Sequence, residues 1–125
     1  MCLDIKPGSK PEIALTDIIV YKHVIATRDP KVFQTSYHHS DVELGVTYKS
    51  EIDTNTDYSI EKALHSYLEL ETADYQAKDY SQVLIECIIP KGSTYYIGIF
   101  YDQPSIASNT LIYVKVIKDY TNVRS

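Results

Sequence analysis

Two segments far apart in the chain are apolar on both faces of a strand, and they constrain the fold more than any other feature. The segments are DIIVYKHVI at residues 17–25 and QVLIECII at residues 82–89. β-branched and aromatic residues favour strands, and an apolar run without alternation indicates a strand covered on both faces. We therefore expect both segments to be central strands of a sheet.

Shorter patterns predict further strands around these two. Residues 46–48 (VTY), Thr94–Phe100 and residues 109–118 (NTLIYVKVIK) have strand character, and in the last of these Ile112, Val114 and Val116 share one face. The connecting segments have turn or loop composition: Asp29–Pro30, residues 53–57 (DTNTD), Pro90–Ser93 and Asp102–Pro104. The predicted strands therefore follow one another with short connections.

One amphipathic helix is predicted over Tyr67–Tyr80. Ser66 and Glu69 have the spacing of a capping box, in which the serine hydroxyl accepts a backbone N–H and the glutamate reaches back. An apolar stripe follows at spacings of three and four, formed by Leu70, Ala73, Ala77 and Tyr80. We expect this stripe to pack on the sheet with Leu70 buried.

These elements predict an α+β fold with a mainly antiparallel sheet of five to seven strands and one principal amphipathic helix, because no β-α-β alternation is visible. The 125 residues suit a single domain spanning 1–125. Residues 1–16 are expected to form an irregular lead-in, and residues 119–125 a polar tail.

Charge and cysteine content narrow the function classes. Twelve Lys and Arg against seventeen Asp and Glu give a formal charge of −5, which argues against duplex nucleic acid as a partner. No apolar run approaches the ~20 residues needed to cross a membrane, and Met1–Lys10 lacks a signal peptide pattern. Cys87 alternates with apolar residues and is expected to be a buried thiol, whereas Cys2 would become an N-terminal nucleophile if Met1 were removed. A cytoplasmic protein is expected, with no membrane contact.

The candidate site centres on His65, directly before the predicted helix. Free N–H groups at a helix start attract anions, and an imidazole beside them adds a donor, so His65, Ser66 and Tyr67 could hold phosphate and stack a base. The alternative is that His65 only bonds a neighbouring carbonyl. Two polar segments could join this site or simply form turns, and they contribute Lys91, Ser93, Ser108 and Asn109.

A metal site and a cofactor are not expected. His38 and His39 are neighbours in the sequence, and neighbouring strand residues point to opposite faces, so they cannot readily share an ion with Asp41 or His23. The twelve tyrosines suit half-buried sheets, ligand stacking or the surface of a homo-oligomer.

Several segments together resemble a known group of proteins. They are MCL at the start, Asp17–Lys22, residues 63–67 (ALHSY), residues 87–98 (CIIPKGSTYYIG) and residues 106–109 (IASN). The pattern resembles small uncharacterised proteins carried by gut anaerobes and their phages, although that family prefers Gly at the position of Ala63. The resemblance implies no established activity. A weaker similarity is to ADP-ribosyltransferase-like folds, which place a His beside a nicotinamide pocket and would leave Glu86 as the strand-borne acid.

The leading hypothesis is a non-catalytic protein that captures an anionic, nucleotide-type small molecule, and the phage context would make sequestration of a defence signal reasonable. An ADP-ribosyltransferase-like enzyme using His65 is one alternative. A structural or partner-binding subunit that forms an oligomer is the other.

Overall fold

The computed structural model describes residues 3–36, 39–53 and 59–121. Within these residues the chain forms a mostly antiparallel sheet of 12 strands and one α-helix, α1 (Leu70–Asp79), which confirms the α+β class. The strands are β1 (Leu3–Asp4), β2 (Glu12–Ile13), β3 (Ile18–Ala26), β4 (Val32–Thr35), β5 (Asp41–Glu43), β6 (Thr47–Lys49), β7 (Ser59–Ile60), β8 (Leu64–Tyr67), β9 (Val83–Ile89), β10 (Thr94–Phe100), β11 (Gln103–Ser108) and β12 (Thr110–Asp119). Cys2, His38, residues 54–57 of the predicted loop and residues 122–125 of the predicted tail lie outside the described residues.

The strands follow the order β6-β12-β9-β3-β8-β11-β10-β1-β7 across the sheet, with β2 paired to β10, β4 to β3 and β5 to β4. The two long apolar runs form β3 and β9, which pair with each other and have further partners on their outer sides, so their central position is confirmed. Val20 lies opposite Cys87, and both are fully buried. The hydrophobic effect of these two runs therefore builds the middle of the sheet.

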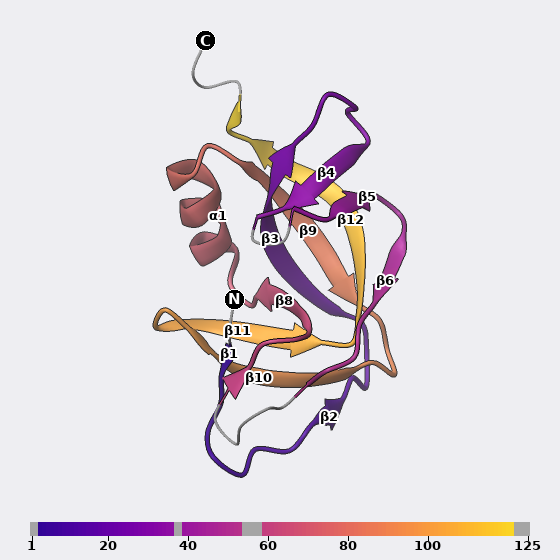
Figure 1. Ribbon diagram of the computed structural model, residues 1–125, viewed down its shortest axis with the longest axis vertical. Helices are drawn as coiled ribbons and strands as arrows, with labels where there is room; N and C mark the ends of the chain where they lie inside the picture. The colour runs from indigo at the N-terminus through magenta and orange to yellow at the C-terminus, as the bar shows by residue number, and fades with distance from the viewer. Residues whose placement is uncertain (1–2, 37–38, 54–58, 122–125) are drawn as a thin grey trace.

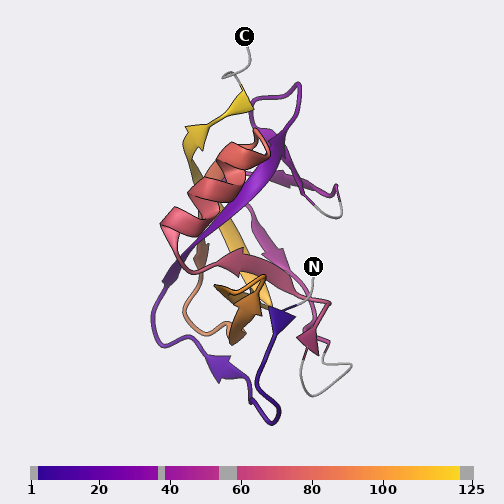
Figure 2. The same cartoon turned by 90° about the vertical axis from the view of Figure 1, so that its left-hand side faces the viewer.

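The sheet changes direction between its two halves. Figure 1 shows β3, β9 and β12 running through the upper half, while β8, β10 and β11 cross the lower half. Figure 2 shows α1 lying along one side of β3. Consecutive strand residues face opposite sides, so Lys22 shares a face with Val20 and Val24 of the core, whereas His23 lies on the helix side.

The predicted helix start is wrong. Ser66 and Tyr67 belong to β8, where they pair with Ile106 and Ser105 of β11, and the helix begins at Leu70 with Glu69 as an N-cap that makes no side-chain cap hydrogen bond. Strand pairing with residues far along the chain outweighs the local capping pattern, because it satisfies backbone groups that a buried segment cannot leave unpaired.

The predicted apolar stripe is correct only in its middle. Ala73 and Ala77 are fully buried, and their small side chains bring α1 close to the sheet. Leu70 is 43% exposed and Tyr80 is 55% exposed, so the prediction that Leu70 is buried is wrong. The helix is short, and its two ends extend past the surface that it covers.

The strand count of five to seven is also too low, because strands of two to four residues carry too little pattern to be recognised. The expected irregular lead-in contains β1 and β2. The segment expected to form turns after Asp102 contains β11, and β12 extends into the expected tail, where Tyr120 is buried. In β12 the buried residues are Leu111 and Tyr113, while Val114 and Val116 are exposed. Two bulges, between Tyr113 and Lys115 and between Val116 and Lys118, interrupt the regular alternation from which Ile112, Val114 and Val116 were expected to share one face. Within the described residues, the single helix is not long and apolar enough to span a membrane.

Candidate ligand-binding cavity

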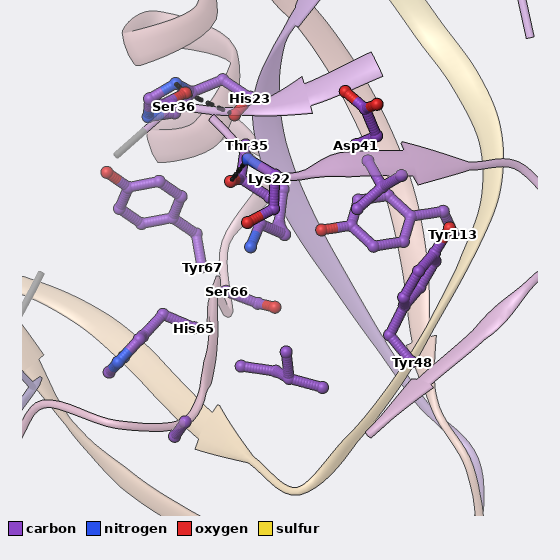
Figure 3. A pocket seen from close by; sticks show the side chains of 14 residues that line it. Lys22, His23, Thr35, Ser36, Asp41, Tyr48, His65, Ser66, Tyr67 and Tyr113 are labelled. Atoms are coloured by element: carbon purple, nitrogen blue, oxygen red, sulfur yellow. Dashed lines mark hydrogen bonds between the residues drawn. The ribbon is translucent and has the colours of Figure 1, made fainter. Parts of the chain in front are cut away.

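A cavity of about 190 Å³ lies beside β3, lined by residues of β3, β4, β5, β6, β8 and β12 and of the segments next to them. Figure 3 shows its walls: Lys22 comes from β3, Ser66 from β8, and Tyr48 and Tyr113 from β6 and β12. Asp41, an exposed residue, is among those that line the cavity. Elements from the first, middle and last parts of the chain are therefore needed to form it.

Lys22 is the cationic group of the cavity. Its stem lies on the apolar face of β3, and Figure 3 shows its amine directed into the space between Ser66 and Tyr113. The Nζ atom lies 5.8 Å from the centroid of the Tyr113 ring, a cation–π distance. Within the part of the chain that the structure describes, Lys22 makes no salt bridge. The ammonium therefore lies in the cavity with no carboxylate of the described residues within ion-pair distance.

Ser66 is the second polar group, and it is almost completely buried. The residue is 2% exposed, and among the described residues its Oγ has no hydrogen-bond partner. Figure 3 shows this hydroxyl directed into the cavity, on the side opposite to His65. A buried hydroxyl without a partner costs roughly 1–3 kcal/mol, so a group that enters the cavity and bonds Oγ would recover that energy.

Tyr48 and Tyr113 form the aromatic wall. Their rings lie edge to face, with centroids 5.6 Å apart and an interplanar angle of 89°. The Tyr48 hydroxyl is held in place because it accepts a hydrogen bond of 2.8 Å from the Glu43 backbone N–H. Burial raises the pKa of Tyr113, although the neighbouring Lys22 acts in the opposite direction. Both rings are therefore fixed by their surroundings.

The upper rim of the cavity is a neutral hydrogen-bonded group around His23. Its Nδ1 donates to the Gln82 side-chain oxygen at 2.6 Å, and the Ser36 hydroxyl lies 2.9 Å from the same oxygen. The imidazole stacks between Tyr67 and Tyr80, with centroid distances of 5.8 and 5.7 Å. Burial lowers the pKa of His23, while the bond to Gln82 raises it by a smaller amount. Because a lowered pKa favours the uncharged imidazole, Lys22 and not His23 supplies the positive charge of the cavity.

Of the seven site residues predicted from the sequence, three line the cavity and four lie elsewhere. His65, Ser66 and Tyr67 all line the cavity, but β8 alternation leaves only Ser66 directed inward. His65 Nε2 donates to the Glu61 carbonyl at 2.8 Å, the carbonyl bond that the alternative interpretation described. The anion site at a helix start is wrong, because no helix begins beside His65.

The other predicted residues lie elsewhere. Lys91 is exposed in the turn after β9, where its N–H donates to Asp17, and Ser93 is buried in the same turn. Ser108 donates to the Thr110 carbonyl at 3.0 Å, and Asn109 accepts from the Thr94 N–H at 3.0 Å. None of these four residues lines the cavity.

The described residues form neither the His65–Glu86 pair of the enzyme alternative nor a metal site. Glu86 forms a 4.0 Å ion pair with Lys115 and does not line the cavity with His65. Across residues 3–36, 39–53 and 59–121, no three His, Cys, Asp or Glu side chains are arranged to hold a metal ion.

Sequence reasoning missed Lys22, Tyr48 and Tyr113. A signal for Lys22 was present, since a lysine inside an apolar strand run, at an even spacing from Val20 and Val24, shares their face. Tyr48 and Tyr113 carried no such signal, because their meeting depends on the pairing of β6 with β12. No family model, curated protein or solved structure matches the chain.

Proposed function

We propose that this protein binds a small anionic molecule in the cavity between β3, β8 and β12, without transforming it. The observation that carries the proposal is the Ser66 hydroxyl, buried in the cavity wall with no partner among the described residues. An unsatisfied buried polar group in a folded protein calls for an explanation, and a bound ligand supplies one. The hydroxyl can donate one hydrogen bond and accept two.

The charge of the ligand follows from Lys22. An ammonium donates three hydrogen bonds and accepts none, so its complement is an acceptor, and a charged acceptor forms the stronger bond. With Ser66 beside it, the amine offers a two-residue site for a carboxylate or phosphate oxygen. A mostly apolar pocket with a few convergent polar groups is the usual form of a small-molecule site.

The surroundings of Ser66 support binding over covalent catalysis. A nucleophilic serine needs a general base within hydrogen-bond reach. His65 is the adjacent residue, but it points to the other side of β8 and donates to a backbone carbonyl. His23 is bonded to Gln82.

Ligand-observed NMR with a library of small anionic and neutral molecules tests the proposal. Hits are mapped by titration into isotope-labelled protein, and we expect the largest amide shifts at Lys22, Ser66 and Tyr113, with little change at Lys91 and Asn109. Hits confined to the turn after β9, or a library that yields none, would overturn the proposal and favour the structural or partner-binding alternative.

A further inference from the structure

We infer that the ligand is an aromatic carboxylate of a single ring, with its acid group at Lys22 and Ser66 and its ring against Tyr113 and Tyr48. The inference rests on the proposed function and narrows the class of ligand. Three properties of the cavity carry it: its volume, its single positive charge and the placement of its aromatic wall.

The volume suits a ligand whose buried part is about one ring. An apolar cavity of about 150 Å³ accommodates benzene, whereas drug-sized ligands occupy pockets of roughly 300–1,000 Å³. At about 190 Å³ the cavity is slightly larger than the first and well below the second. A six-membered ring with one small substituent fits this volume, whereas a base, a sugar and a phosphate together would extend out of the cavity.

The charge limits the ligand to a single negative group. Lys22 is the only Lys or Arg that lines the cavity within the described residues, and the pKa of His23 is lowered by burial, which favours its neutral form. Asp41 is an exposed residue of the cavity lining, and its carboxylate accepts a hydrogen bond of 3.1 Å from Gln34. A phosphate carrying two charges, or a chain of phosphates leading outward, would leave charge unbalanced and approach this carboxylate.

The remaining space is bounded by aromatic rings. Lys22 already lies over the Tyr113 ring, so an acid group that binds the amine brings the rest of the ligand to the same wall. The perpendicular Tyr48 and Tyr113 rings offer one edge and one face, and a third ring can join such a pair in offset or edge-to-face contact. A planar aromatic ring therefore uses this wall better than a saturated ring.

The experiment measures affinity by isothermal titration calorimetry with four probes: benzoate, its neutral analogue benzamide, cyclohexanecarboxylate and adenosine monophosphate. We expect benzoate to bind most tightly, with the other three at least about tenfold weaker. The Lys22→Met variant keeps the length of the side chain and removes its charge, so it should weaken benzoate by about 10- to 100-fold and leave benzamide nearly unchanged. Ser66→Ala should also weaken benzoate, and the exposed Lys91→Met is the matched control that should not.

Each other outcome counts against the inference. If adenosine monophosphate or cyclohexanecarboxylate binds as tightly as benzoate and depends on Lys22, the ligand class is wrong while the proposed function stands. If benzoate binds equally well to Lys22→Met and Ser66→Ala, both shown by urea unfolding to be folded, the placement is wrong. If no probe binds at millimolar concentration, the inference fails, and the NMR library decides the proposed function separately.

Discussion

The buried hydroxyl of Ser66 leads to a prediction whose sign is opposite to that of most core substitutions. Ser66 is 2% exposed and its buried Oγ has no partner among the described residues, so the burial of this hydroxyl costs about 1–3 kcal/mol relative to water. Ser66→Ala removes the hydroxyl and leaves a small void, so we expect the ligand-free protein to gain about 1 kcal/mol in free energy of unfolding. With an unfolding entropy of about 2.1 cal/mol/K per residue, this corresponds to a rise in Tm of about 4 °C for a chain of 125 residues.

Ser108 provides the matched control. It is fully buried in neighbouring β11, and its Oγ donates to the Thr110 carbonyl at 3.0 Å. Ser108→Ala should therefore lower the free energy of unfolding by about 1 kcal/mol, the net value of a hydrogen bond. Urea unfolding and calorimetry measure both variants without ligand. If Ser66→Ala loses as much stability as Ser108→Ala, the Ser66 hydroxyl has a partner in the free protein and the argument for the cavity fails.

Four further predictions concern the fold. Gly98→Ala should lower the free energy of unfolding by about 3 kcal/mol, because the new Cβ would lie 2.2 Å from a backbone oxygen of β1; a wild-type urea midpoint would show that β1 does not pass there. Leu70→Ala should cost less than about 1 kcal/mol, since a 43% exposed leucine loses little on truncation; a loss in the 2–5 kcal/mol range of buried leucines would contradict the helix position. Cys87 should resist thiol reagents in the native protein and react in urea, because burial raises its pKa to about 12, and rapid native labelling would disprove its burial. The lowered pKa of His23 means that the unfolded chain binds its proton more readily, so stability should be full above pH 6.5 and fall as the pH drops below it; His23→Gln should weaken that dependence, and an unchanged pH profile would refute the assignment.

The elements that were predictable from sequence are those whose pattern is long. β3 and β9 were recognised because seven or more residues of each are strand-forming and apolar on both faces. The start of α1 was misplaced because Ser66 and Glu69 satisfy a local capping rule, whereas the strand pairing that decides their structure comes from β11. Strands of two residues, such as β1, gain their definition from their neighbours in the sheet.

The candidate site was predictable only in part, for the same reason. Ser66 was identified, although for a role at a helix start that it does not have. Lys22 could have been identified from alternation alone, since its charge interrupts an apolar face. Tyr48 and Tyr113 could not, because the bulges of β12 and its pairing with β6 determine which tyrosines meet at the cavity.

The position of β1 has a consequence for the order in which the protein can fold during synthesis. Asp4 pairs with Ile99, 95 positions later in the chain, and β7 joins the sheet through β1. At a translation rate of about 5–20 residues per second, β1 waits roughly 5–20 s before its partner in β10 has been made. During that time β1 and β7 can pair only with each other. The lower half of the sheet therefore closes in a late step, when the beginning of the chain returns to a strand that is among the last to be synthesised.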